Sequence, residues 1–327
     1  MQMLSSSPKV SDAPPTSLAE EIMTRGYAHQ RGFLNQEEIR SLKQLYEKTE
    51  LSNTSNYPIR LVSDCSIIDR AIVDKINAVQ RSAFPQEELF LACAAFFSVT
   101  NADLNNSVNF PYHQDYEHLF TFQDQFYYLN LYVILEKADV ENSNVTVVPF
   151  DAIKKKDPTL HQILKGSGAT RFREGMLVND NFGVTYKSDV NFEEISVTPK
   201  LDVGDLLLMR GDLVHRTQNQ KADRIAVSFR AVNKMAVANR RKLVNLSFAK
   251  LRFINNDPEI YAVVDYIYRR DGVDFVAAEE LHLKIRDLYA KLRRGEHTGF
   301  NYHFLAFRIK IWLLMQFCRI FRIGYAP

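Results

Sequence analysis

Three side chains in two separate segments could together bind a metal ion. His113 and Asp115 stand two residues apart in PYHQDYEHL, and His215 comes much later, in GDLLLMRGDLVHRTQNQKADR. Residues i and i+2 of a strand share one face, so the His-x-Asp pair would project both side chains to the same side. Two imidazoles and one carboxylate are typical of the facial triad that holds iron(II) and leaves coordination positions open. A single histidine is also compatible with a structural role, so this prediction depends on the surrounding residues.

Arg224 opens the strand-like segment RIAVSFRAV, shortly after His215. Many iron(II) triads work with 2-oxoglutarate, whose distal carboxylate needs a buried guanidinium that can bind it with two hydrogen bonds. Strand alternation puts Arg224, Ala226, Ser228 and Arg230 on one face. Arginines at both ends of one face suit a cavity that receives anions. Alternatively, the face that carries the two arginines could be exposed to solvent and line no cavity.

The region between Leu89 and Val232 consists of short β-branched and aromatic runs such as FYYLNLYVILE, VTVVP and DLLLM. Such runs predict an antiparallel sandwich or barrel. In FYYLNLYVILE, alternation groups Tyr128, Asn130 and Tyr132 on one face, which makes Asn130 and Tyr132 candidates for the cavity wall. Ordinary aromatic packing would produce the same pattern.

Helices are expected on both sides of this region. Ser17 with Glu20, and Asn35 with Glu38, form capping-box patterns, Gly26 would end the first helix, and a third helix would cover Ile68 to Arg81. A loop-rich insertion, Asp151 to Glu174, would interrupt the strands. After Asn233 the sequence predicts helices to the end, one of them from Phe275 to Arg294.

Four segments, in this order, resemble the phytanoyl-CoA dioxygenase family of iron(II)/2-oxoglutarate oxygenases, over about Leu18 to Val232. The four segments are RGYAHQRGFLNQEEI, YHQDYEHL, ENSNVTVVP and GDLLLMRGDLVHRTQNQKADR. The resemblance implies a mainly β fold with a double-stranded β-helix (jelly roll, cupin-like) core, N-terminal helices packed on it and a helical C-terminal extension. After VTVVP the chain departs from the family pattern, because FDAIKKKDP stands where the family usually has Gly-Ser-His.

The resemblance also implies roles for individual residues. His113, Asp115 and His215 would be the iron ligands, and Arg224 would bind the distal carboxylate of 2-oxoglutarate. Thr217, where the family often has a hydroxyl, would share that carboxylate, and Asn130, Tyr132 and Ser228 would be further contacts. With Fe(II), 2-oxoglutarate and O2, the expected reaction is hydroxylation of a small-molecule or lipid-like substrate with release of succinate and CO2.

Three other functions fit parts of the sequence. RIAVSFR has the R-x5-R spacing of AlkB-type nucleic-acid demethylases, although the opening helices and ENSNVTVVP favour the first family and make a nucleic-acid partner the weaker prediction. A non-catalytic jelly-roll binding protein would keep the cavity without turnover. A cupin with other metal chemistry would not need Arg224. The substrate and the oligomeric state cannot be derived from this sequence.

Charge divides the chain into two parts. From Lys234 onward there are 17 Lys and Arg against 9 Asp and Glu, whereas the rest has 24 against 30. We expect a Ser/Pro-rich disordered leader (1–16), an oxygenase domain (17–233) and a basic helical extension (234–327). The apolar tail FLAFRIKIWLLMQFCRIFRI could dock on the jelly roll, form a dimer seam or lie on an anionic membrane. Three scattered cysteines and the absence of a signal pattern predict a cytoplasmic protein. If the apolar tail lies on an anionic membrane, the protein would be peripheral to that membrane.

Overall fold

The computed structural model describes most of the chain. The described residues are 17–51, 59–99, 111–115, 128–168, 170–173, 176–179, 184–218, 222–244, 248–256, 258–296 and 298–322. The leader 1–16 and the last four residues of YHQDYEHL therefore lie outside them.

The N-terminal elements begin and end where local residue chemistry predicts. Helix α1 (Leu18–Arg25) is capped by the Ser17 side chain and ends at Gly26, whose φ of 84° lies in the left-handed region. Strand β1 (Tyr27–Gln30) leads to α2 (Gln36–Lys48), which begins with the reciprocal capping box of Asn35 and Glu38. Strand β2 (Ile59–Val62), the 3-10 turn η1 (Cys65–Ile67) and α3 (Arg70–Ala83) follow. The predicted helices are confirmed here.

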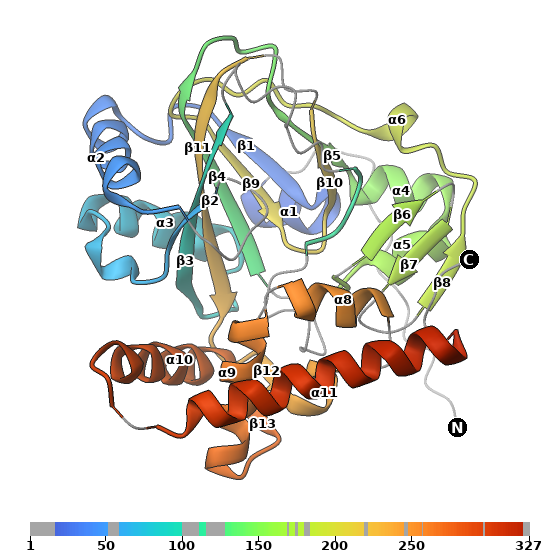
Figure 1. Ribbon diagram of the computed structural model, residues 1–327. Helices are drawn as coiled ribbons and strands as arrows, with labels where there is room; N and C mark the ends of the chain where they lie inside the picture. Colours follow the sequence, from blue (N-terminus) through green and yellow to red (C-terminus); the bar gives the residue numbers. More distant parts are fainter. Residues whose placement is uncertain are drawn as a thin grey trace, which may run out of the picture.

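A six-stranded antiparallel sheet forms the centre of the molecule, in the order β1-β9-β4-β11-β3-β2. Its other strands are β3 (Leu89–Val99), β4 (Tyr128–Lys137), β9 (Leu206–Arg210) and β11 (Arg224–Asn233). One face, with Leu131 and Phe229, packs on α1, α2 and α3 in a shared hydrophobic core (Figure 1). Helices thus cover one side of the sheet.

The opposite face of the large sheet packs on a second antiparallel sheet. This smaller sheet consists of the pair β5 (Val145–Val148) and β10 (Val214–Thr217) and of the three strands β6 (Thr170–Arg173), β7 (Met176–Asn179) and β8 (Val184–Lys187). The β-bridges of His113 to His215 and to Arg171 join the two parts. A hydrophobic cluster between the sheets joins Ile134 and Ala226 to Val147 and Val214. The chain passes from β4 to β5, and from β9 through β10 to β11, so it alternates between the sheets. This alternation is the jelly roll, and the predicted fold is confirmed.

The insertion after β5 is more ordered than expected. Instead of a loop, it holds α4 (Phe150–Lys156) and α5 (Pro158–Leu164), with Asp157 capping the second helix. Phe150, Ile153, Leu160 and Leu164 of these helices are buried in the cluster between the sheets. A short helix α6 (Phe192–Ile195) precedes β9. The sequence FDAIKKK, where the chain departs from the family pattern, is α4.

The C-terminal part has a hydrophobic core of its own. It consists of β12 (Val237–Asn239), α7 (Arg240–Leu243), α8 (Phe248–Asn256), α9 (Pro258–Asp271), β13 (Phe275–Ala277), α10 (Ala278–Arg293) and α11 (Phe300–Phe321). The helix expected from Phe275 was wrong at its start, because the first three residues pair with β12 as a strand. Helix α11 lies on α8 and α9 rather than on the jelly roll (Figure 1). Among the described helices, none is long and apolar enough to cross a membrane.

Candidate metal centre

The structure brings His113, Asp115 and His215 together between the two sheets. Their ligand atoms all lie within 4.8 Å of one another. His113 forms a β-bridge to His215, with backbone N–H donors and carbonyl acceptors exchanged at 3.0 Å in both directions. The strand ladder of the small sheet thus holds two distant parts of the sequence side by side, and three candidate ligands converge on one point.

The two imidazole rings are oriented by their own backbones. Nδ1 of His113 lies 2.8 Å from the carbonyl oxygen of Pro111, and Nδ1 of His215 lies 3.0 Å from that of Leu213. A carbonyl oxygen can only accept, so each Nδ1 carries a proton, and in the neutral ring Nε2 presents the lone pair. Both Nε2 atoms face Asp115. This is the tautomer that a metal ion requires of a histidine ligand.

The two carboxylate oxygens of Asp115 have different neighbours. Oδ2 accepts hydrogen bonds from Tyr128 Oη at 2.7 Å, Asn130 Nδ2 at 2.8 Å and Arg230 Nη1 at 3.1 Å. Oδ1 instead faces Nε2 of His113 at 3.7 Å and Nε2 of His215 at 3.5 Å. One oxygen is held by the protein, and the other points to the space that the imidazoles share. The donor set therefore fits a metal ion bound through Oδ1 and both Nε2 atoms.

The protonation states agree with this geometry. Burial lowers the pKa of His215 to about 4, so its ring is neutral at pH 7. Burial alone would raise the pKa of Asp115, but nearby charges and a hydrogen bond hold it well below its ordinary value. The largest cause that lowers this pKa is the charge of protonated His215, followed by the charge of Arg230. An ionised carboxylate and a neutral imidazole are the forms that bind metal.

Buried polar contacts fix the segments that carry these residues. Gln114 is fully buried, and its Nε2 donates to the carbonyl oxygens of Leu164 at 2.8 Å and Asp212 at 2.6 Å. Its backbone N–H donates to Thr170 at 2.8 Å. The residue between the two ligands thus ties them to α5, to β6 and to the turn before β10.

The turn before β10 requires a glycine because of close packing. A Cβ added to Gly211 would lie 2.0 Å from a ring carbon of Tyr128, far inside van der Waals contact. The Gly211 backbone N–H also donates to the Tyr128 carbonyl at 2.9 Å. Gly211 therefore gives Tyr128 the room to reach Asp115.

Arg224 is buried on the same wall of the large sheet. One guanidinium nitrogen, Nη1, donates to the Ser143 carbonyl oxygen at 2.6 Å. The guanidinium carbon lies 5.8 Å from the ring centre of Tyr132, and Tyr132 stands opposite Ser228 in the strand register. Arg224 therefore lies beside Tyr132, on the same strand as Arg230, which bonds Asp115.

Two polar atoms on this wall have no hydrogen-bond partner among the described residues. They are Nε of Arg224 and Oη of Tyr132, and both are buried. Burial raises the pKa of Tyr132, so its hydroxyl keeps the proton. A buried donor without an acceptor is costly. The two donors suit an anionic group placed between them.

The remaining predicted co-substrate contacts lie on strands β4, β10 and β11. Asn130 bonds Asp115 directly, as described above, and also accepts from Arg230. Ser228 is buried between Ala226 and Arg230 on β11. Thr217 lies two residues after His215 on β10, so the two side chains share a face.

Sequence reasoning missed the hydrogen-bonding roles of Tyr128 and Arg230 and the packing role of Gly211. Tyr128 was visible only as a member of the Asn130 face, and Arg230 only as a second arginine on the Arg224 face. Alternation assigns a face, but it does not say which side chain reaches Asp115. No local signal marked Gly211, because the clash is with a ring on a distant strand.

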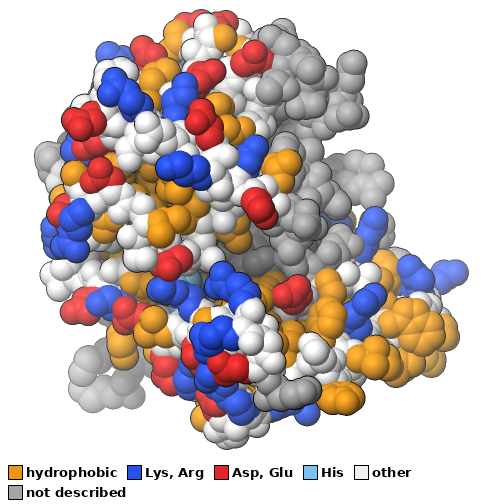
Figure 2. Space-filling model, turned by 60° about the vertical axis from the view of Figure 1, so that its left-hand side comes forward, with side chains coloured by type: hydrophobic (Ala, Val, Ile, Leu, Met, Phe, Trp, Pro, Cys, Tyr) orange, Lys and Arg blue, Asp and Glu red, His pale blue; other side chains and the backbone are white. Residues whose placement is uncertain are grey.

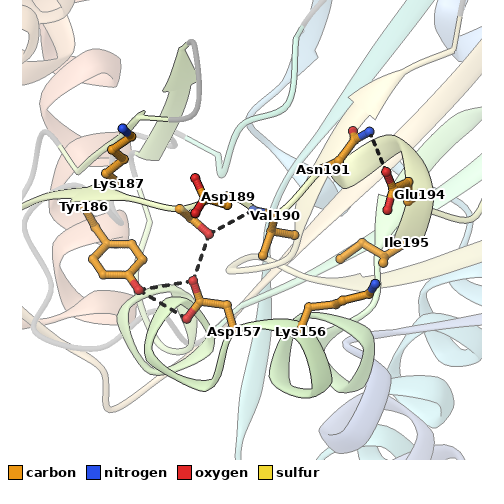
Figure 3. Close-up of a pocket in the computed structure, with 10 residues that line it drawn as sticks. Lys156, Asp157, Tyr186, Lys187, Asp189, Val190, Asn191, Glu194 and Ile195 are labelled. Atoms are coloured by element: carbon orange, nitrogen blue, oxygen red, sulfur yellow. Dashed lines mark hydrogen bonds between the residues drawn. The ribbon is translucent and has the colours of Figure 1, made fainter.

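A separate hollow of about 320 Å³ lies near the N-terminus of α5 (Figure 3). Asp157 on its wall accepts from the Leu160 backbone at 2.8 Å, from Ser188 Oγ at 2.8 Å and from Tyr186 Oη at 3.2 Å. None of the three candidate ligands lines it. We assign no chemistry to this hollow, because its central acid is already engaged.

Comparison with solved structures finds proteins of similar fold at low identity. SnoN, described as a non-heme alpha ketoglutarate dependent epimerase from nogalamycin biosynthesis, is 17% identical with a TM-score of 0.44, over 68% of this chain and 83% of its own. EvdO2 from Micromonospora carbonacea var. aurantiaca, in complex with 2-oxoglutarate, is 14% identical with a TM-score of 0.47, over 69% and 94%. HygX from Streptomyces hygroscopicus, with nickel and 2-oxoglutarate bound, is 15% identical with a TM-score of 0.41, over 65% and 84%.

No family model matches the chain, and no curated protein is similar to it in sequence. At the identities and TM-scores above, structural likeness carries no argument about function.

Proposed function

We propose that the protein is an iron(II)- and 2-oxoglutarate-dependent dioxygenase. One observation carries the proposal: Asp115 Oδ1 and the Nε2 atoms of His113 and His215 converge with the protonation that metal binding needs. Two neutral nitrogens and one carboxylate oxygen are the donor set of the non-haem iron oxygenases. Such a centre supplies the oxidation of an organic substrate by O2, coupled to the decarboxylation of 2-oxoglutarate to succinate and CO2.

The residues around the triad have separate tasks in this proposal. Tyr128, Asn130 and Arg230 hold Oδ2 of Asp115, so that Oδ1 keeps its direction toward the metal position. Arg224 and Tyr132 bind the distal carboxylate of 2-oxoglutarate through their buried, unpaired donors. Thr217 and Ser228 contact the same co-substrate from β10 and β11.

The spacing along the large sheet supports this assignment. Tyr132 stands opposite Ser228, and Asn130 stands opposite Arg230, two residues along β11. Two residues of a strand correspond to about 7 Å. A five-carbon dicarboxylate can bridge such a distance, with one end at the metal position and the other at Tyr132, whose ring centre lies 5.8 Å from the guanidinium carbon of Arg224.

The substrate in this proposal is a small or lipid-like molecule that is hydroxylated, and the chain belongs near the phytanoyl-CoA dioxygenase family. The order of the four resembling segments supports that placement. The AlkB-like alternative is weaker, because Arg230, its second arginine, is engaged by Asp115 and Asn130.

A substrate-free assay tests the proposal directly. The full chain is supplied with iron(II), ascorbate, 2-oxoglutarate and O2, and succinate is measured. In parallel, anaerobic addition of iron(II) and 2-oxoglutarate is followed by the visible charge-transfer band of the chelate. The proposal expects the band and slow succinate release. The band without succinate would indicate the non-catalytic binding protein. The absence of both the band and succinate would refute the proposed site.

A further inference from the structure

Helix α11 is apolar on two opposite faces. One face is buried in the C-terminal core through Phe300, Phe307, Ile311, Met315 and Cys318. The other face is exposed, and its large apolar residues are Leu305, Ile309, Trp312, Leu313, Phe317 and Ile320. Figure 2 shows hydrophobic side chains gathered at the lower right of the molecule with Lys and Arg side chains beside them, at the height of α11 in Figure 1. A contiguous apolar surface of this kind marks an interaction site.

Cations border the exposed apolar face. At 3.6 residues per turn, Arg308 and Arg319 lie on one edge of the helix and Lys310 on the other. These three and Arg322 are exposed. None forms an ion pair with another residue in the described part of the chain, and α11 contains no Asp or Glu. The helix therefore presents unneutralised positive charge on both sides of an apolar strip.

The Lys310 edge borders a hollow of about 210 Å³. Arg240 and Arg241 line it from α7. Asp274 pairs with both arginines, and Asp265 pairs with Arg240, so Lys310 is the cation of this hollow without an acidic partner among the described residues. The basic edge thus borders a recess in which the three cations Arg240, Arg241 and Lys310 outnumber the two acids.

We infer that α11 docks the protein on an anionic lipid surface, with Trp312 and its apolar neighbours in the interface and the basic residues at the phosphates. Long basic side chains at the edge of an apolar helix face suit this environment, because their stems stay apolar while their charges reach the head groups. A second copy of the chain is the less suitable occupant. Two α11 helices packed face to face would bring their basic edges together, with no acid on either helix to neutralise them.

Trp312 makes the inference directly measurable. It is the only tryptophan of the chain and is 56% exposed. On addition of vesicles of phosphatidylcholine mixed with phosphatidylserine, we expect a blue shift of its emission and quenching by brominated acyl chains. Binding to vesicles of phosphatidylcholine alone should be at least about tenfold weaker, and added salt should weaken binding to the mixed vesicles.

Matched variants separate the contributions of charge and apolar contact. The double variant Arg308→Gln/Arg319→Gln should bind mixed vesicles about tenfold more weakly. Its control, Lys154→Gln/Lys155→Gln on α4, removes two exposed cations elsewhere and should bind normally. Leu313→Ser should also weaken binding, whereas Leu283→Ser on α10 should not, although each leucine is 55% exposed.

Two results would overturn the inference. The first is an unchanged Trp312 emission on mixed vesicles, with no quenching by brominated lipid. The second is a dimer, detected by light scattering without vesicles, that buries Trp312 and dissociates in Leu313→Ser. That result would identify a second copy of the chain as the occupant of this face.

Discussion

The candidate metal centre depends most on Asp115, because its two carboxylate oxygens have different partners. In the proposed centre Oδ1 would complete the donor set, and Oδ2 pairs with the buried Arg230. Asp115→Ala removes a ligand and leaves that charge without its acid. We expect succinate formation to fall below detection and iron(II) affinity to fall by on the order of a hundredfold or more.

Calorimetry with iron(II), beside the succinate assay, measures both effects. Asp189→Ala, an exposed acid of the separate hollow, is the control and should behave as the wild type. If Asp115→Ala kept normal iron affinity, Asp115 would not be a ligand.

Arg224 is predicted to act on the co-substrate and not on the metal. Its guanidinium is buried beside Tyr132 and is not among the donors that hold Asp115 Oδ2. Arg224→Ala should raise the KM for 2-oxoglutarate by about 10- to 100-fold, as expected for a lost charged hydrogen bond. Iron affinity without co-substrate should not change.

The split between KM and metal affinity is the measurement that decides the role of Arg224. Arg224→Lys should recover only part of the loss, because a single ammonium cannot bind a carboxylate with two parallel hydrogen bonds. Arg252→Ala, exposed on α8, is the control. An unchanged KM in Arg224→Ala would contradict the assignment.

At the scale of elements, the turn between β9 and β10 sets the position of a β4 side chain. A methyl group at Gly211 overlaps the Tyr128 ring, and the ring must move away from Asp115. We expect Gly211→Ala to lower iron affinity by about tenfold. Tyr128→Phe, which keeps the ring and loses the hydroxyl, should show a loss of similar size.

A double-mutant cycle tests this cause. In a Tyr128→Ala background there is no ring to displace, so adding Gly211→Ala should cost little more. Fully additive losses would show that Gly211 acts through something other than Tyr128.

Helix α11 offers two isoleucines on opposite faces. Ile311 is buried in the C-terminal core, whereas Ile309 is 52% exposed. Ile311→Ala should lower the free energy of unfolding by about 2–4 kcal/mol because it leaves a cavity. Ile309→Ala should change it by less than about 0.5 kcal/mol. Denaturant unfolding measures both, and equal effects would mean that the helix packs in another orientation.

At the scale of the whole molecule, the metal centre joins separate parts of the chain. His113 and Asp115 lie in a short segment before β4, and His215 lies on β10, which only the folded small sheet brings beside them. A ligand that binds only the native state stabilises it, by about 2.7 kcal/mol at a hundred times its Kd. Iron(II) added without oxygen should therefore raise the Tm by several degrees.

Chelation should reverse that shift, and Asp115→Ala should abolish it. Differential scanning fluorimetry under nitrogen is sufficient for the measurement. An equal rise in Asp115→Ala would place the bound metal elsewhere.

The jelly-roll body and the C-terminal helices have separate hydrophobic cores, and a few contacts connect them. Arg286 of α10 pairs with Asp64 at 3.1 Å, and the His282 ring lies 5.5 Å from Phe90 of β3. The division of the sequence at residue 233 remains a prediction, but the two cores agree with it. In the proposed membrane-bound state, α11 would contact the lipid surface, and α10 would connect the C-terminal helices to the acidic jelly-roll body.

Features that depend on short-range rules could be predicted from the residue types and their spacing. Capping residues predicted α1 and α2, strand alternation put Asn130, Tyr132, Arg224 and Arg230 toward the space between the sheets, and residue types marked the triad.

Which side chains contact Asp115 and Tyr128 could be seen only in the tertiary structure. Which oxygen of Asp115 faces the imidazoles depends on strand register between β4 and β11, and the room for Tyr128 depends on a glycine in a distant turn. The orientation of α11 could not be derived because both of its faces are apolar, and packing on α8 and α9 chose between them. Local patterns assign a residue to a face, whereas contacts between distant segments arise only when the sheets close on each other.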